Sequence, residues 1–104
     1  MHDHLAWGLV GLYRGTQDEE IYAAGDDGGT LTLRERRALR TGDFYALLPP
    51  RDDIHRVRTT SPQTSVSIHL LTNDTGCVWR HAFDEGSGEA APFRSGYVNV
   101  DCDD

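Results

Sequence analysis

Short stretches that alternate between apolar and polar residues follow one another along the whole chain. Residues 30–33 read Thr-Leu-Thr-Leu, and residues 65–71 place Val66, Ile68 and Leu70 on one face of an extended segment. Alternation with period two is typical of β-strands, because successive side chains point to opposite faces. We predict strands over eight segments, namely residues 5–13, 20–24, 30–33, 44–48, 54–58, 65–71, 77–83 and 96–100.

Turn residues separate these segments. Glycine and aspartate dominate residues 25–29 and 41–43, and the strand at 44–48 ends at Pro49 and Pro50. Such clusters terminate strands. Residues 35–39 fit either a helical turn or an edge strand. With about eight strands and no alternation of strands with helices, the chain is predicted to be an all-β sandwich or barrel.

The composition agrees with a single folded domain. The chain has 104 residues, of which 38% are hydrophobic and 26% charged, and this length allows one modest core. The formal charge of −7 disfavours nucleic acid and anionic membranes as partners. No apolar run has the length of a membrane span and no signal peptide is recognisable, so we expect a cytoplasmic protein.

The two cysteines, Cys77 and Cys102, lack the spacing of a metal-binding or redox pair. In a cytoplasmic protein they are predicted to be reduced thiols. Cys102 lies in an acidic tail, residues 101–104, which we expect to be frayed and to follow a single domain of residues 1–100. The acidic run at residues 18–20 is likewise interpreted as solvated surface.

The histidines give the strongest indication of chemistry. His2 and His4 are two residues apart, so on an extended segment they lie on one face, about 6.6 Å apart along the strand. His55, far along the chain, could complete a site of three imidazole nitrogens, a set that suits iron, zinc, copper or nickel. The alternatives are incidental histidines at a frayed N-terminus or the remnant of a tag.

Two groups of residues around these histidines resemble the two motifs of the cupins. They are His2, His4, Gly8 and Gly15, followed by Gly42, Asp43, Pro50, Asp52, His55 and Thr59. The resemblance implies a double-stranded β-helix, also called a jelly-roll barrel. Gly8 stands where many cupins have a carboxylate ligand, so the implied metal site has three histidines alone. Asp52 and Thr59 replace a glycine and an asparagine of the second motif.

A longer resemblance is to the thiol dioxygenases within the cupins, the group of cysteine dioxygenase and 3-mercaptopropionate dioxygenase. It depends on four runs in order, at residues 2–15, 48–57, 65–80 and 93–97, and extends from His2 to about Asn99. It implies oxidation of a small thiol carboxylate, 3-mercaptopropionate or cysteine, to its sulfinate with O2. Iron(II) would be the cofactor, held by His2, His4 and His55.

The same resemblance implies roles for residues outside the metal site. The family has a Ser-x-His-x-Tyr triplet beside the iron, and this chain has Ser67, His69 and Leu71 there. Arg80 matches an arginine that pairs with the substrate carboxylate in the mercaptopropionate branch, a task suited to a guanidinium fork. Taken alone, Arg80 could equally be a surface arginine. Trp7 is expected to form a wall of the pocket or part of the core.

Related dioxygenases carry a substantial portion of chain, including barrel strands, ahead of the first two histidines. We therefore expect this chain to lack part of the barrel. An uncovered sheet edge and core face would favour self-association, for example as a homodimer. The alternative function is a truncated or degenerate metal-binding cupin module without turnover, which the leucine at position 71 favours.

Overall fold

The chain folds into antiparallel β-strands and the segments that connect them. A computed structural model describes residues 1–25 and 30–103. In this part of the chain no helix is long and apolar enough to cross a membrane. The strands are β1 (Gly8–Arg14), β2 (Gln17–Ala24), β3 (Leu31–Leu39), β4 (Phe44–Leu47), β5 (Ile54–Thr59), β6 (Val66–Leu71), β7 (Arg80–Phe83) and β8 (Ala90–Phe93). The prediction of an all-β protein is confirmed.

Two three-stranded sheets form the body of the fold. Strand β1 is the centre of one sheet, in the order β4-β1-β6, and β2 is the centre of the other, in the order β3-β2-β5. Strands β7 and β8 form a separate hairpin. Every strand pair is antiparallel. The described strands thus make a sandwich with an added hairpin and do not close into a barrel.

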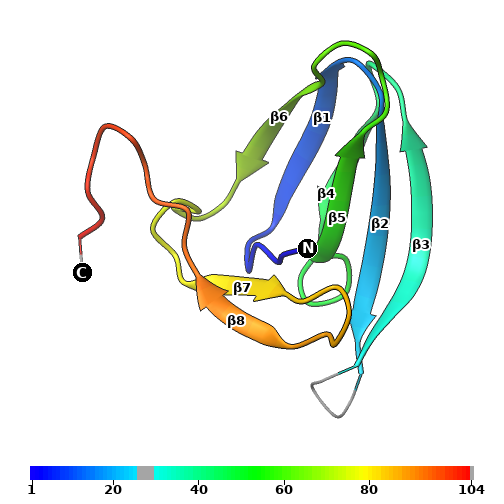
Figure 1. Cartoon of the computed structure of the whole chain (residues 1–104). Coiled ribbons are helices and arrows are strands. Elements are labelled where there is room, and N and C mark those ends of the chain that lie inside the picture. Colours follow the sequence, from blue (N-terminus) through cyan, green and yellow to red (C-terminus); the bar gives the residue numbers. More distant parts are fainter. Residues whose placement is uncertain (26–29, 104) are drawn as a thin grey trace.

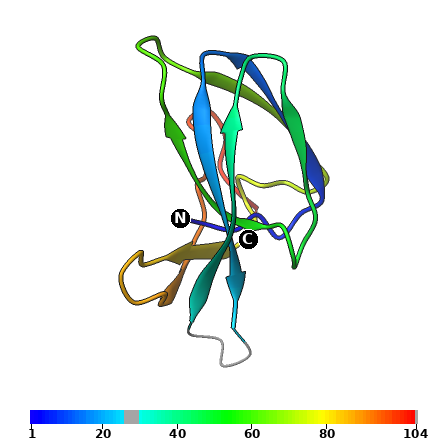
Figure 2. The same cartoon turned by 90° about the vertical axis from the view of Figure 1, so that its right-hand side faces the viewer.

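Three turns connect the two sheets at one end of the sandwich. They are residues 15–16, 40–43 and 60–65, and they are tied together by side chains. The Thr16 and Thr60 hydroxyls lie 2.8 Å apart, and the Thr41 hydroxyl donates to the Gly15 carbonyl at 3.0 Å. From this end the sheets diverge, and the N-terminal segment and the β7-β8 hairpin lie at the opposite, open end (Figure 1, Figure 2).

The N-terminal segment, residues 1–3, is paired on both sides. His2 exchanges two backbone hydrogen bonds with His55 of β5, at 3.2 and 3.1 Å. On the other side, the Asp3 amide donates to the His81 carbonyl at 3.1 Å and the Phe83 amide donates to the Met1 carbonyl at 3.0 Å. The segment therefore connects β5 to β7 and fills the open end of the sandwich.

The apolar core lies between the sheets. It consists of Val10, Leu12, Tyr45 and Leu47 from the first sheet and Leu39 from the second, with Leu71 packed against them. Strands β1 and β4 each contribute two residues that alternate with outward-facing neighbours, and β3 contributes Leu39 at its end. The core does not extend to the open end of the sandwich, where buried polar side chains such as His4, Asp53 and His55 lie instead.

Most predicted strands are found, and the differences have local causes. Residues 35–39 belong to β3, so the edge-strand alternative is confirmed. The strand predicted at 77–83 begins only at Arg80, because residues 77 and 78 form a turn on Asp74. The strand predicted at 96–100 is wrong. The last strand is β8, which contains Pro92, a residue that argues against a strand except at an edge. The turn predicted at 25–29 falls mostly outside the described residues.

The prediction of two reduced thiols is wrong, because Cys77 and Cys102 form a disulfide. It closes a loop with a sequence separation of 25 residues and attaches the C-terminal segment to the turn that precedes β7. The acidic tail is therefore anchored at Cys102 rather than frayed. The spacing of the two cysteines did not predict this disulfide, because pairing depends on how close the two residues lie in the fold and not on a sequence pattern.

We predict that the double variant Cys77→Ser, Cys102→Ser unfolds more easily than the wild-type protein. Losing a cross-link over a loop of this length should lower the free energy of unfolding by about 2–4 kcal/mol. Urea denaturation followed by tryptophan fluorescence measures the difference. A reducing agent should shift the wild-type midpoint by the same amount and leave the variant unchanged. Two titratable thiols in the native, unreduced protein would contradict the prediction.

Candidate metal centre

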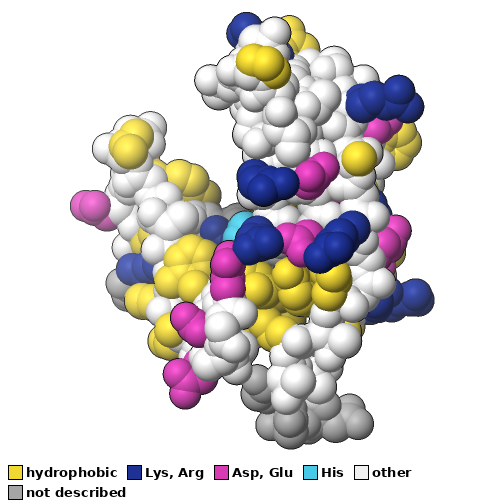
Figure 3. Space-filling model, turned by 45° about the vertical axis from the view of Figure 1, so that its right-hand side comes forward, with side chains coloured by type: hydrophobic (Ala, Val, Ile, Leu, Met, Phe, Trp, Pro, Cys, Tyr) yellow, Lys and Arg dark blue, Asp and Glu magenta, His cyan; other side chains and the backbone are white. Residues whose placement is uncertain are grey.

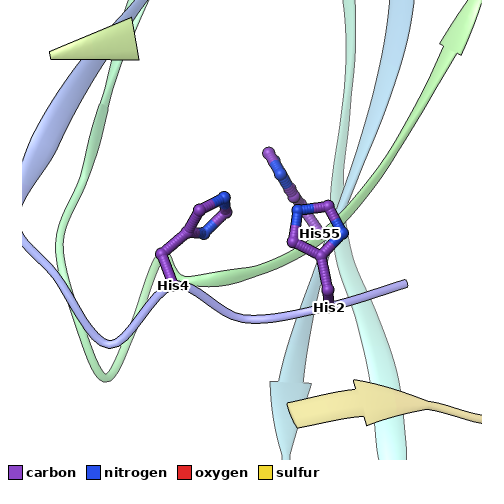
Figure 4. A group of neighbouring side chains, drawn as sticks. All are labelled: His2, His4 and His55. Atoms are coloured by element: carbon purple, nitrogen blue, oxygen red, sulfur yellow. The ribbon is translucent and has the colours of Figure 1, made fainter. Parts of the chain in front are cut away.

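Three histidine side chains converge where the N-terminal segment meets β5. One ligand nitrogen from each of His2, His4 and His55 lies within 4.8 Å of the others. The ring centroids are 4.8–4.9 Å apart, and Figure 4 shows the three rings gathered about one point. His4 and His55 are buried and His2 is half-buried. The structure thus brings together all three ligands that the sequence predicted.

Asp53, at the end of the loop between β4 and β5, fixes the backbone around His4. Its Oδ1 accepts the His4 amide at 2.9 Å and its Oδ2 accepts the Leu5 amide at 3.0 Å. Leu5 has a φ of 52°, a left-handed conformation that costs a non-glycine residue about 1–2 kcal/mol. The two hydrogen bonds to one carboxylate stabilise this turn, which directs the chain from the N-terminal segment into β1.

Two of the three imidazoles are backed by buried carboxylates. The His4 ring donates from Nδ1 to Asp53 Oδ1 at 3.1 Å, and the His55 ring donates from Nδ1 to Glu19 Oε2 at 2.9 Å. Such bonds fix the tautomer and leave Nε2 as the free, more basic ligand atom. Histidines that bind metals in proteins almost always have a partner of this kind.

Both carboxylates are almost fully buried, with exposed fractions of 3% for Asp53 and 1% for Glu19. Burial opposes ionisation of Asp53, but hydrogen bonds from the His4 ring and the Leu5 and His4 amides outweigh it and hold its pKa below the usual value. Buried charges in proteins are paired or coordinate metals. A divalent cation among the three imidazoles would balance this negative charge.

Tyr45 and Arg37 complete the surroundings of Glu19. Burial and the nearby Glu19 carboxylate raise the pKa of the Tyr45 phenol well above its ordinary value, so the phenol stays protonated at neutral pH. Arg37 Nη1 lies 3.5 Å from Glu19 Oε1, and the Arg37 guanidinium lies over the Tyr45 ring at 5.9 Å. These contacts hold Glu19 against His55 from the side opposite the cluster.

Among the described residues, no carboxylate partners His2, and its ring is held neutral. Burial, together with the neighbouring His55 and His4 rings and the Arg80 guanidinium, lowers the pKa of His2 to about 3. A neutral imidazole is the form that binds a metal ion. The cluster is therefore ready to bind a cation at neutral pH without first losing a proton from this ligand.

His69 of β6 pairs with Val10 and so lies on the inner face of its sheet, but it is exposed to solvent. Burial and the nearby His4 and His55 rings lower the pKa of His69. A hydrogen bond of 2.9 Å joins its Nε2 to Ser67 Oγ, as the same-face alternation of β6 allows. The structure thus brings Ser67 and His69 together, and it places His69 near enough to the cluster for their charges to interact.

Leu71 and Gly8, the two main departures from the cupin pattern near the site, are partners across β6 and β1. A Cβ atom added to Gly8 would lie 2.7 Å from Leu71 Cδ2 and 2.5 Å from the Leu70 carbonyl oxygen. Leu71 also packs against the core. The leucine therefore occupies the space beside Gly8, and no side chain fits at position 8 without moving β6.

Arg80 is buried close to the cluster rather than exposed. Its Nη1 donates to the Asp3 carbonyl at 2.9 Å and its Nη2 donates to Ser95 Oγ at 3.3 Å, while Nε is buried without a partner. The guanidinium also lies 4.7 Å from the centre of the Phe93 ring. The alternative of a surface arginine is therefore wrong. One donor, Nε, remains available for a further acceptor.

Trp7 lies between the cluster and β1, and its indole is 61% exposed. Its carbonyl accepts hydrogen bonds from the amide and the hydroxyl of Thr72, at 3.0 and 2.8 Å. The core alternative for Trp7 is therefore wrong, and its role as a pocket wall remains a prediction.

Sequence reasoning missed both carboxylates. The acidic run at residues 18–20 was interpreted as solvated surface, and this is wrong for Glu19. The signal was present, because Glu19 shares a strand face with Gln17 and Ile21, which are both buried. The role of Asp53 was not predicted, because nothing in the sequence indicates which of the adjacent Asp52 and Asp53 carboxylates points inward.

A scan against models of known protein families finds none that matches the chain. The chemistry of the site therefore depends on its donor set. Three neutral imidazoles without a thiolate suit iron, zinc, copper or nickel, and three protein ligands leave positions open for exogenous molecules. A closed structural zinc site normally has four protein ligands. A metal ion held by these three rings alone would have positions open for further ligands.

We predict that Glu19→Gln weakens metal binding about 10–100-fold, because the substitution removes the charge that orients His55 and makes it more basic. Titration calorimetry with a divalent transition-metal ion measures the affinity. The matched control is Glu20→Gln, which alters the neighbouring carboxylate on the outer face, where Glu20 pairs with Arg56. Equal affinities for wild-type protein and Glu19→Gln would contradict the prediction.

We predict that acid destabilises the metal-free protein partly through His2. The pKa of His2 is about 3 in the fold against an ordinary value of 6.5, so the unfolded chain takes up the proton first. The free energy of unfolding should be highest above pH 6.5 and should fall as the pH is lowered toward 3. Urea denaturation across this range measures it. The variant His2→Gln should show a shallower decline, and an unchanged slope would rule out the assignment.

Proposed function

We propose that this protein is an iron(II)-dependent thiol dioxygenase with a cupin-type double-stranded β-helix. It would oxidise a small thiol carboxylate, 3-mercaptopropionate or cysteine, to the sulfinate with O2. The observation that carries the proposal is the convergence of His2, His4 and His55, with buried carboxylates behind two of them. The antiparallel two-sheet architecture supports the cupin assignment, and so does the resemblance of the motifs.

Iron(II) fits the three Nε2 donors, and it would supply a place where the thiol binds as thiolate and O2 is reduced. Glu19 and Asp53 hold two of the ligands in the required tautomer. In the overall reaction both oxygen atoms join the sulfur, which supplies the electrons, and the thiol proton passes to solvent.

Arg80 is the residue proposed to bind the substrate carboxylate. Its Nη1 donates to the carbonyl of Asp3, which lies between His2 and His4 in the chain, and its Nε is buried without a partner among the described residues. A buried donor without a partner costs about 1–3 kcal/mol, and an acceptor from a substrate removes that cost. Anchoring the carboxylate there would hold the sulfur in one position relative to the three histidines.

His69 is proposed to orient species in the pocket by hydrogen bonding. Its lowered pKa keeps the ring neutral at physiological pH, so it can both donate and accept. Ser67 fixes the ring through Nε2, which leaves Nδ1 free for other contacts. Leu71 brings no hydroxyl, so any proton that the family tyrosine would handle must here pass through His69 or water.

The second candidate is a metal-binding cupin module without turnover. The observation that favours it is Leu71, which packs on the core where the family has a tyrosine. This candidate shares the metal site with the enzyme but predicts no product. The cytoplasmic location expected from the sequence belongs to neither proposal, because disulfides such as Cys77–Cys102 are rare in the cytosol.

We predict that the iron-loaded protein consumes O2 in the presence of 3-mercaptopropionate or cysteine and forms the matching amount of sulfinate. An oxygen electrode and mass spectrometry of the product measure both quantities. His55→Asn should abolish iron binding and activity together. His69→Gln should keep the iron and lower kcat about 10–100-fold. The control His81→Gln changes a histidine outside the cluster and retains a donor for Asp3.

The outcomes separate the two candidates. Iron bound at one ion per chain without sulfinate from either thiol supports the binding module and overturns the enzyme. Absence of iron binding overturns both proposals.

A further inference from the structure

The outer face of the β4-β1-β6 sheet is largely apolar, and the charged Arg14, which pairs with Val66 beyond a bulge in β1, lies at its margin. Along these strands Val10, Leu12 and Tyr45 point into the core, so their alternate neighbours point outward. The outward positions are Leu9, Gly11, Tyr13, Phe44, Ala46, Val66, Ile68 and Leu70. We call these eight residues the apolar face. None of them is charged, in a chain in which 26% of the residues are charged.

The large side chains of this face are exposed to an unusual degree. The exposed fractions are 75% for Phe44, 69% for Leu70, 68% for Tyr13, 62% for Ile68, 49% for Leu9 and 41% for Val66. With roughly 180 Å² for a fully exposed side chain of this size, the face presents on the order of 650 Å². Monomeric proteins rarely leave a larger contiguous apolar patch in water.

The other sheet shows what a solvent-facing surface looks like in this protein. The outer face of β3-β2-β5 carries ion pairs between Arg36 and Glu20, Arg56 and Glu20, and Arg58 and Asp18. Figure 3 shows basic and acidic side chains interleaved on this side of the molecule. The two sheets therefore differ in kind, because ion pairs cover the outer face of β3-β2-β5 whereas the eight residues of the apolar face include no charge.

The apolar face is also shaped to fit a copy of itself. Phe44, Gly11 and Ile68 form one row across the three strands, and Ala46, Leu9 and Leu70 form the next. The small residues Gly11 and Ala46 lie diagonally beside each other, so we infer a shallow furrow next to Phe44, the most exposed side chain of the apolar face. Under a two-fold axis, Phe44 of each copy can lie in the furrow of the other.

We propose that the apolar face binds a second copy of this chain, so that two β4-β1-β6 sheets pack face to face in a two-fold homodimer. Such an interface would bury about 1,300 Å², which lies within the range of specific, stable complexes. A two-fold contact uses the same patch on both copies and leaves none of it exposed, so association stops at two. The proposal is independent of the activity proposed above.

The absence of charge identifies the class of partner. A nucleic acid or a charged peptide would find no opposite charge on the apolar face, whereas an identical apolar surface needs none. The two copies do repel each other through their net charges of −7 each, and salt screens this repulsion. The homodimer should therefore become tighter as the salt concentration rises, opposite to the behaviour of a complex held by ion pairs.

Sedimentation velocity of the full chain, over a wide range of concentrations at low and high salt, tests the proposal. We expect a monomer–dimer equilibrium that shifts toward dimer with salt. Phe44→Lys should raise the dimer Kd at least about 30-fold, as expected for a central aromatic anchor. The matched control Leu33→Lys places the same charge on the outer face of the other sheet and should leave the Kd unchanged.

The variant Gly11→Val distinguishes an effect on dimerisation from an effect on the stability of the fold. A Cβ atom at Gly11 would meet only Phe44 Cβ at 3.9 Å, an ordinary contact, and valine suits a strand better than glycine. The variant should unfold no more easily than wild type and yet dimerise more weakly, because the furrow is filled. A monomeric wild-type chain, a dimer that survives both Phe44→Lys and Gly11→Val, open-ended oligomers, or a monomer that binds lipid vesicles would each overturn the proposal.

Discussion

The backbone pairing of His2 with His55 is the contact on which the rest of the structure depends. Its two hydrogen bonds place the N-terminal segment between β5 and β7, and so join the sandwich to the β7-β8 hairpin. The same pairing sets two imidazoles side by side, and the alternation of an extended chain delivers His4 to the same point. One register therefore determines the topology of the open end and the geometry of the candidate metal site together.

Charge in the interior follows from that geometry. Three histidine rings lie against two buried carboxylates, and Arg37 and Arg80 are close by. Removing any one of these groups leaves a charge or a donor buried without its partner, and this is costly in an apolar interior. The small hydrophobic core around Val10 and Leu47 thus provides only part of the order at this end. The polar network provides the rest.

The sequence alone was sufficient for features with a local signal. Period-two alternation located most strands, and the two-residue spacing of His2 and His4, with His55 behind two prolines, predicted which three histidines converge. Features that depend on distant neighbours were missed. Three such features are the burial of Glu19, the inward position of Asp53 and the disulfide between Cys77 and Cys102. Each depends on which strands pair, and the sequence of a single segment does not reveal its pairing partner. Strand β8 was not predicted, because its sequence consists largely of small residues and contains Pro92, which argues against a strand except at an edge.

The contact between Gly8 and Leu71 links two sequence differences that seem unrelated when they are read along the chain. Across the β1-β6 pair they occupy one volume, so neither position can change freely while the other stays. A carboxylate at position 8 would press on the leucine and on the Leu70 carbonyl, and the resulting shift of β6 would carry His69 with it. The two positions are thus epistatic. Adding a fourth, carboxylate ligand at position 8 would require a smaller residue at position 71 and a movement of β6.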